Sequence, residues 1–206
     1  MTTLRADAER NRERVLDQAT RLLAQDPAVG VGEIAHAAGV GRATLYRHFP
    51  TREDLLAAID ERAFEETEAA FAASRLAEGT ATAALERLVT ALLEVGDRYR
   101  FLLAEDALAI KRKHHRERNE RQAATLFALV ERGQAAGEFS RSIAPRWMLA
   151  VFGAVIVAAI REIAEGRLDR EEAPAVVTDS LLYGYGSVPH EASREGSLTP
   201  RRRRLA

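Results

Sequence analysis

The chain has 206 residues, 30 lysines and arginines, 31 aspartates and glutamates, and a formal net charge of −1. It has no cysteine, which excludes disulfides, thiolate metal sites and cysteine nucleophiles. Hydrophobic residues make up 47% of the chain, which argues against disorder throughout. The near-neutral charge excludes a uniformly basic coat protein, so any nucleic-acid binding must come from a local basic surface.

Apolar residues recur at spacings of three and four along most of the chain, which is the periodicity of amphipathic helices. Pro27, Gly39 and Pro50 separate the first elements. No alternating run is long enough for a strand. The sequence therefore predicts an all-α fold of about nine helices, three short ones within residues 9–49 and five or six longer ones within residues 51–185.

The stretch 31–54 predicts a helix-turn-helix, that is, two short helices joined by a glycine-containing turn. Ile34 provides a buried position on the first helix, and Leu45 and Phe49 do so on the second. Gly39 can adopt the positive φ that a sharp turn requires.

The same stretch has an unusual charge pattern. No acidic residue lies between Ile34 and Arg52, although residues 1–55 as a whole hold eight arginines and eight carboxylates. A carboxylate-free basic surface is what a DNA backbone requires. The alternative is the ordinary solvated basic face of a helical hairpin. The candidate DNA-binding residues, each able to donate a hydrogen bond, are Arg42, Thr44, Tyr46, Arg47, His48, Thr51 and Arg52.

The motif GVGRATLYRHFPTREDLL resembles the DNA-binding signature of the tetracycline-repressor (TetR) family. The resemblance implies that Tyr46 and His48 contact phosphates and that Arg52, at the start of the fourth helix, binds the DNA backbone. Arg42 and Arg47 are the better candidates for reading guanine in the major groove. The resemblance also implies a helix-turn-helix domain over residues 1–50, followed by a larger helical domain for effector binding and dimerisation over residues 51–186.

Two positions depart from the family pattern. Gly30 and Gly41 stand where the family often has threonine and serine as helix N-caps, and glycine caps more weakly. Thr51, in contrast, is well placed to cap the fourth helix, with Asp54 three residues further on.

The most apolar run, Trp147 to Ile160, has 14 residues, fewer than the roughly 20 needed to span a bilayer. It predicts a buried helix. One interpretation makes this helix the centre of a single core. The other, which the resemblance also implies, pairs it with the helix over residues 174–184 in a four-helix bundle with a second copy. The candidate interface residues are Ala150, Gly153, Ala154, Val157, Val177, Leu181 and Gly184.

The resemblance implies that a small molecule binds among the central helices. The apolar and aromatic candidates for the lining of this pocket are Leu92, Val95, Tyr99, Phe101, Leu103, Phe127, Val130, Trp147 and Phe152. No cofactor or metal site is predicted, because the adjacent His114 and His115 point to different sides of a helix.

The remaining segments carry weaker signals. The run Lys111 to Arg121 predicts a solvated linker, with a site for an anionic ligand or an extra nucleic-acid contact as the alternative. Residues 187–206, with arginines at 201–204, predict a disordered basic tail. The N-terminus has no apolar core of a signal peptide, so a cytoplasmic location is expected.

The function that we expect is that of a ligand-responsive repressor, a homodimer that binds a palindromic operator in double-stranded DNA and has no membrane partner. The alternative is a constitutive or architectural DNA-binding protein without an effector. The sequence lacks a glycine-rich phosphate loop and the HExxH and GxSxG motifs, so we do not expect an enzyme.

Overall fold

The computed structural model describes residues 2–103 and 116–185. Within these ranges the chain forms eight α-helices, one 3-10 helix and no strand, which confirms the all-α prediction. The proposed tail at 187–206 and residues 111–115 of the basic run lie outside the described residues. The elements are α1 (Thr2–Gln25), α2 (Val31–Ala37), α3 (Arg42–His48), α4 (Arg52–Ala73), α5 (Ala81–Arg98), η1 (Arg100–Leu103), α7 (Arg116–Ala136), α8 (Pro145–Ala164) and α9 (Ala173–Tyr185).

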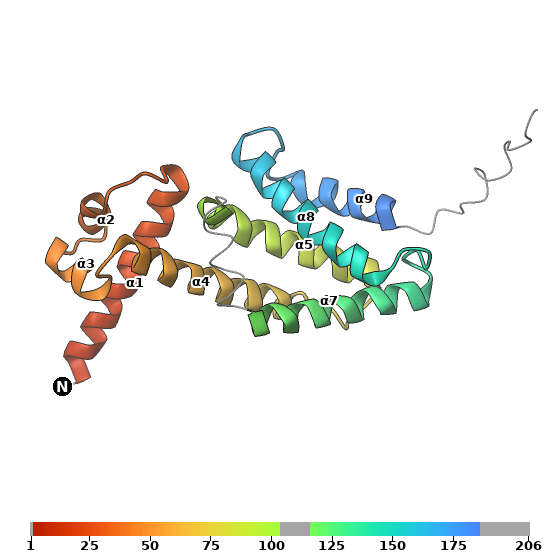
Figure 1. Cartoon of the computed structure of the whole chain (residues 1–206), viewed down its shortest axis with the longest axis horizontal. Helices are drawn as coiled ribbons and strands as arrows, with labels where there is room; N and C mark the ends of the chain where they lie inside the picture. The colour runs from red at the N-terminus through yellow and green to blue at the C-terminus, as the bar shows by residue number, and fades with distance from the viewer. Residues whose placement is uncertain (1, 104–115, 186–206) are drawn as a thin grey trace, which may run out of the picture.

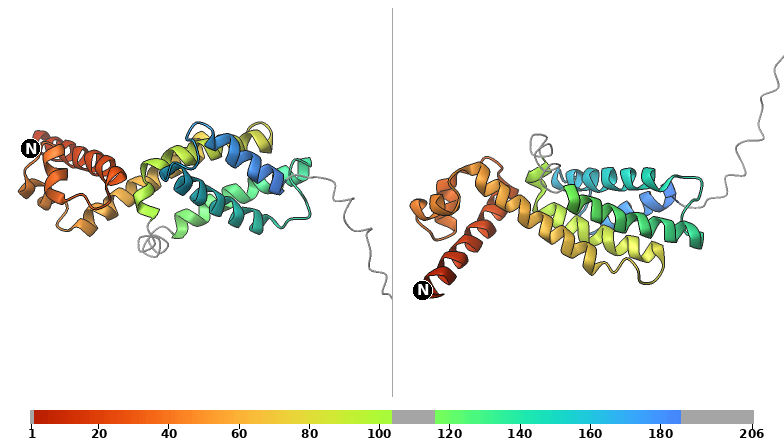
Figure 2. Two further views of the ribbon diagram at one scale, coloured as in Figure 1. Left: turned by 90° about the horizontal axis from the view of Figure 1, so that it is seen from above. Right: turned by 60° about the horizontal axis from the view of Figure 1, so that its bottom comes forward.

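The molecule is elongated, with two hydrophobic cores connected by α4 (Figures 1 and 2). The first core joins α1, α2, α3 and the start of α4, and the second joins α5, α7, α8 and α9. The sequence prediction places the domain boundary at residue 50, just before α4 begins. The first core nevertheless includes Leu55 and Ile59 of α4 and also Tyr99 and Leu102, so packing does not follow the chain order strictly.

Helix α1 begins roughly two turns earlier than the sequence pattern predicts, since it starts at Thr2. Side-chain pairs three residues apart line this added segment: Arg10 pairs with Asp7, and Arg12 lies 3.8 Å from Glu9. Such pairs support a helix that has no apolar stripe. Apolar periodicity alone could not reveal this extension.

The central helix of the second domain is α5, not α8. It packs against α4, α7, α8 and α9, and it buries Leu85, Leu88 and Val89. Gly96 allows α8 to approach closely, because a Cβ added there would collide with the side chain of Ile160. The interpretation of α8 as the centre of a single core is therefore wrong.

Helix α8 has 20 residues, so it is longer than the 14-residue apolar run from which it was predicted. By length and composition alone, α8 would be long and apolar enough to cross a membrane, a test that core helices of soluble proteins also pass. Only 28% of its most apolar window is buried in this single chain. One face, with Met148, Phe152 and Ile156, lies in the second core, and the opposite face is open.

The prediction of a solvated linker is wrong for the end of the basic run, because residues 116–121 belong to α7. Arg118 lies over the ring of Phe64, 4.3 Å from its centroid. It also forms ion pairs with Glu61 and with Glu68, the latter at 2.6 Å. This arginine therefore fastens α7 to α4.

The N-terminus of α5 is capped from a distant loop. The carboxylate of Glu138 accepts hydrogen bonds from the backbone N–H groups of Ala81 at 3.0 Å and Thr82 at 2.8 Å. Thr80 accepts the next N–H, that of Ala83, at 3.1 Å. The hydrogen bonds, that from Thr82 above all, lower the pKa of Glu138 from its ordinary value of 4.5.

We predict that Glu138→Gln lowers the free energy of unfolding at pH 7 by about 1–2 kcal/mol, because Ala81 and Thr82 donate to different carboxylate oxygens and glutamine replaces one of them with an NH2 group that cannot accept. The folded pKa of Glu138 is below its unfolded value, so this stabilisation is present above about pH 4.5 and is lost as the pH falls through the folded pKa. Urea unfolding at pH 7 and at lower pH measures the difference between the two proteins. The difference should shrink on acidification, and a constant difference would contradict the assignment. Glu86→Gln, on the exposed side of α5, is the control.

Candidate nucleic-acid interface

The turn between α2 and α3 has the predicted geometry. Gly39 has φ +64°, and its N–H donates to the carbonyl of His36 at 3.0 Å. Ile34, Leu45 and Phe49 are all buried in the first core, as the sequence pattern predicts. These contacts hold α3 against α2 and α1 and turn the remaining side chains of α3 outward.

The N-caps also agree with the sequence analysis. Gly30 and Gly41 adopt ordinary extended conformations and provide no side-chain cap. Thr51 forms a capping box with Asp54: its hydroxyl accepts from the Asp54 N–H at 3.0 Å, and the Asp54 carboxylate accepts from the Thr51 N–H at 3.0 Å. Thr51 is therefore occupied as a cap, and the start of α4 is fixed relative to α3.

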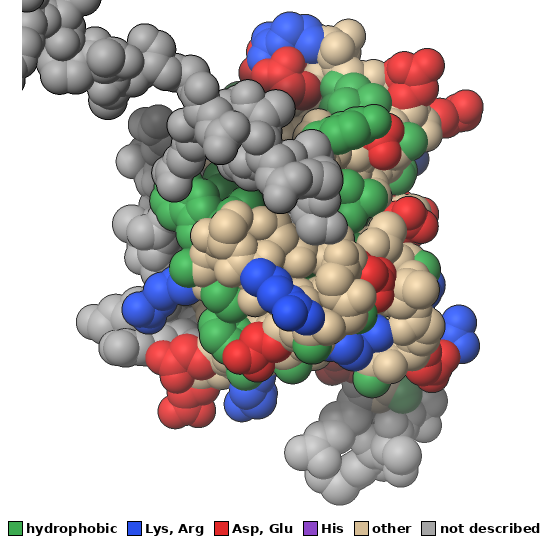
Figure 3. Space-filling view, turned by 90° about the vertical axis from the view of Figure 1, so that its right-hand side faces the viewer, with side chains coloured by type: hydrophobic (Ala, Val, Ile, Leu, Met, Phe, Trp, Pro, Cys, Tyr) green, Lys and Arg blue, Asp and Glu red, His purple; other side chains and the backbone are tan. Residues whose placement is uncertain are grey.

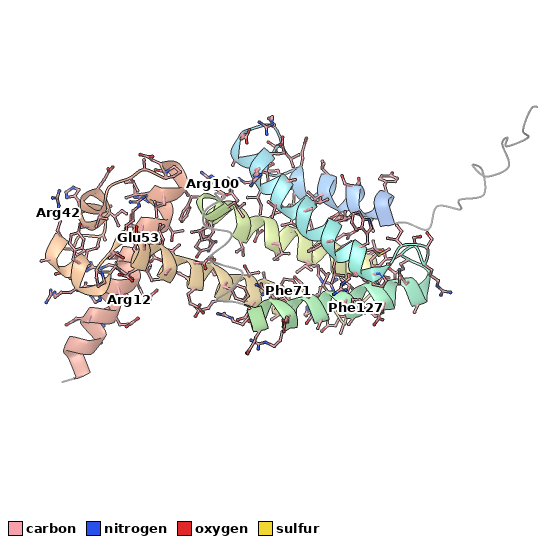
Figure 4. All side chains as sticks on the ribbon, viewed as in Figure 1. Arg12, Arg42, Glu53, Phe71, Arg100 and Phe127 are labelled. Carbon is pink, nitrogen blue, oxygen red and sulfur yellow. The ribbon has the colours of Figure 1, made fainter. Side chains whose placement is uncertain are left out.

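The outer face of α3 is exposed and basic. Arg42, Tyr46 and Arg47 are exposed there, and neither arginine has a carboxylate partner within the described ranges. Arg47 donates to the hydroxyl of Thr44 at 2.9 Å, while His48 is half-buried beside Phe49. Figure 4 shows Arg42 at the outer end of the first domain. No carboxylate of residues 2–103 or 116–185 thus competes for the two predicted base-reading arginines.

Gly32 supports this face in a way that the sequence analysis missed. The Arg42 guanidinium lies directly over Gly32 of α2, so that an added Cβ would be 2.6 Å from Nη2. A side chain at position 32 would therefore displace Arg42. The sequence gives no sign of this role, because Gly32 lies within α2 and not at a turn. Only the contact between α2 and α3 shows it.

The structure gives Arg52 a role within the first domain. Its guanidinium donates to the carbonyls of Val29 at 2.6 Å and Pro27 at 2.7 Å. These bonds hold the loop between α1 and α2 against the start of α4. These two bonds use part of the donor capacity of Arg52. The contact of its remaining donors with the DNA backbone stays a prediction.

We therefore predict that Arg52→Ala lowers the free energy of unfolding of the protein by about 1–2 kcal/mol, since two carbonyls lose a charged donor. Urea unfolding without DNA measures this loss. An Arg52→Ala protein as stable as the wild type would show that these two bonds contribute nothing.

The predicted pocket residues do not gather in one place. Leu92, Leu103, Val130 and Phe152 belong to or pack on the second core, whereas Val95, Tyr99 and Phe101 belong to or pack on the first. Phe127 is exposed on α7 (Figure 4).

Trp147, also a predicted pocket residue, is 64% exposed, so it lies on the open face of α8 and not in the interior.

Tyr99, another predicted pocket residue, donates its hydroxyl to Glu66 at 2.7 Å. Burial and this hydrogen bond raise the pKa of the Tyr99 hydroxyl.

The predicted interface residues also divide into two groups. Ala150, Gly153 and Ala154 lie on the open face of α8, and Val157 is half-buried. Val177 and Leu181 are 3% and 1% exposed, because they pack inside the second core of the same chain.

The assignment of Val177 and Leu181 to a partner-facing surface is therefore wrong, and α9 exposes Val176 and Tyr183 instead. Gly184 lies in α9 but outside the residues whose burial is described. Figure 3 shows hydrophobic side chains at the surface of this end of the molecule.

Known proteins share this arrangement. A family model for bacterial regulatory proteins of the tetR family matches residues 15–59. The transcriptional repressor LfrR of Mycolicibacterium smegmatis is 31% identical over 186 residues, which cover 88% of this chain and 93% of the repressor. The uncharacterised regulator Rv1255c of Mycobacterium tuberculosis is 56% identical over 52 residues, 24% of this chain and 26% of that protein.

Solved structures give the same result. The crystal structure of LfrR in complex with proflavine has a TM-score of 0.62 and 31% identity, and the match covers 85% of this chain and 96% of that chain. A regulator from Saccharomonospora viridis in complex with choline has a TM-score of 0.71 at 21% identity and covers 84% of this chain and 96% of its own. The second likeness shows the fold alone.

Proposed function

The chain belongs to the TetR family of bacterial regulatory proteins, and we propose that it is a repressor that binds a palindromic operator as a homodimer. Members of the family are transcriptional regulators and not enzymes. The observation that carries the proposal is the outer face of α3, where Arg42 and Arg47 are exposed without a carboxylate partner in the described part of the chain. A cytoplasmic location belongs to the same proposal.

The proposed contacts divide into two kinds. Tyr46, His48, Thr44 and the start of α4 position the protein on the phosphates, and Arg42 and Arg47 read base edges. Thr51 and Arg52 mainly hold α4 in place, in view of their hydrogen bonds within the first domain.

Selection from random duplex DNA with the purified protein tests this assignment. We expect a palindrome whose half-sites are centred about 34–36 Å apart or a multiple of that distance. Arg42→Ala and Arg47→Ala should each relax the preference at one base pair per half-site, at a cost of about 1–3 kcal/mol. Arg121→Ala, on the exposed surface of α7, should leave the selected sequence unchanged. Enrichment without a palindrome would contradict the proposal.

The open face of α8 supports the homodimer. Trp147, Ala150, Ala154 and Ala158 are exposed at spacings of three and four, so they form one apolar stripe along the helix. Nothing lies within 4 Å of a Cβ added at Gly153, so the backbone of a second copy has room to approach. We propose that this stripe packs on its counterpart in a second copy, with Val176 and Tyr183 of α9 beside it.

We predict that Ala154→Glu disrupts the dimer, because it puts a charge in the middle of the stripe. Sedimentation equilibrium should show twice the 22.7 kDa chain mass for the wild type and a single chain mass for the variant. Ala69→Glu, at an exposed position on α4, is the control and should remain dimeric. A dimeric Ala154→Glu protein would exclude α8 from the interface.

We further propose that a small organic molecule in the second domain releases the operator. The homologous repressor was crystallised with proflavine, a planar aromatic cation, which makes such cations the first compounds to test. Leu92, Leu103, Val130 and Phe152 are the predicted pocket residues that share the second core. To shift the protein from mostly operator-bound to mostly released, the effector must bind the released state about 10⁴-fold more tightly than the DNA-binding state.

The alternative, a constitutive or architectural factor, predicts that operator affinity is insensitive to every compound. A ligand that binds the protein and lowers its operator affinity distinguishes the two.

A further inference from the structure

A cavity of about 460 Å³ lies where the two domains meet. We call it the junction cavity. Its walls are formed by Thr20 and Arg21 of α1, Arg62 and Glu66 of α4, and Arg98 and Tyr99 at the end of α5. None of these residues belongs to the proposed DNA-binding face. The cavity also lies outside the second core, where we propose that the effector binds.

The carboxylates of the junction cavity already have partners. Asp17 lies 2.6 Å from the Arg62 guanidinium. Glu66 accepts from Arg98 and from the Tyr99 hydroxyl, both at 2.7 Å. Four arginines and two carboxylates line the cavity, so its walls carry a net charge of +2.

Thr20 is a second, independent feature. Its side chain lines the junction cavity and is only 6% exposed, yet its hydroxyl has no hydrogen-bond partner among the described residues. Three other helical threonines, Thr67, Thr90 and Thr125, donate to the carbonyl four residues earlier. An unpaired buried hydroxyl destabilises the folded protein, so polar groups in such positions normally have a partner.

Arg21, the next residue on the same wall, has no ion pair or hydrogen bond with any residue in the described ranges. Two groups of the cavity thus have no protein partner in the described ranges, the buried Thr20 hydroxyl and the Arg21 guanidinium, which is exposed. Both donate hydrogen bonds, and the guanidinium matches the geometry of a carboxylate. Ala24 adds an apolar surface beside them.

We propose that the junction cavity is a second ligand site, which binds a small organic carboxylate. Arg21 and the Thr20 hydroxyl donate to the carboxylate oxygens, and the carbon skeleton lies against Ala24. Because the walls come from α1 in the first domain and from α4 and α5 in the second, a bound carboxylate stabilises the observed packing of the domains.

The proposal is tested by isothermal titration of the full chain without DNA, with succinate, citrate and inorganic phosphate at constant ionic strength. We expect succinate or citrate to bind the wild type, and Arg21→Gln to weaken this binding at least tenfold. Arg14→Gln removes the same charge from the same helix outside the junction cavity, so it should bind as the wild type does. Absence of carboxylate binding, or equal binding by Arg21→Gln, would overturn the proposal. Tighter binding of phosphate than of either carboxylate would overturn the assigned ligand class.

The variant Thr20→Val distinguishes a ligand-binding threonine from a purely structural one. It keeps the shape of the side chain and removes the unpaired hydroxyl, so without ligand the variant should be at least as stable as the wild type. With ligand, its affinity should fall at least threefold. A variant that is less stable without ligand would show that the hydroxyl has a partner within the protein, which would contradict the proposed role. Both outcomes are independent of operator binding.

Discussion

The whole molecule depends on one continuous helix that is shared by two hydrophobic cores. Helix α4 has 22 residues and is therefore about 33 Å long. The capping box at Thr51 fixes its first turn beside α3, and Leu55 and Ile59 bury that end in the first core. Phe71 packs on the second core at the other end. Because a packed helix is stiff, a displacement of either end moves the other. In the proposed dimer, the spacing of the two α3 helices is therefore coupled to the packing of the second domain.

Several arginines of this chain bind backbone carbonyls in addition to the arginines that pair with carboxylates. Arg52 binds the α1–α2 loop, and Arg87 donates to three carbonyls at the end of α4 and in the turn that follows. Arg132 binds two more carbonyls in that turn, and Arg141 holds the end of α7. A guanidinium has five donors in a planar fork, so one side chain can satisfy several of the carbonyls that a helix end leaves free. The abundance of arginine over lysine thus has a structural use, whatever its genetic origin.

The sequence predicted the features that depend on residues close together in the chain. It failed for features that depend on contacts between helices. The turn at Gly39, the buried faces of Ile34, Leu45 and Phe49, and the Thr51 cap follow from local chemistry, and the structure has them all. Val177 and Leu181 were misassigned because a helix with apolar residues on most sides does not show which side meets its own core. The role of Gly32 was missed because it depends on a contact with Arg42 of another helix. The role of Glu138 was missed because it caps α5, which is distant in sequence.

The pattern of burial also shows how the two domains are held together. Tyr99 and Leu102 follow α5, the central helix of the second domain, yet both side chains are buried in the first core. Arg100, between them, donates to the carbonyl of Ala24 at the end of α1, and Figure 4 shows it where the two domains meet. The first domain therefore touches the second at two places, along α4 and through the segment after α5. Two separate contacts prevent free rotation about α4, so a rearrangement of α5 must shift or break the contact with α1. In the proposed mechanism, the α1–α5 junction transmits to α3 a change that begins in the second core.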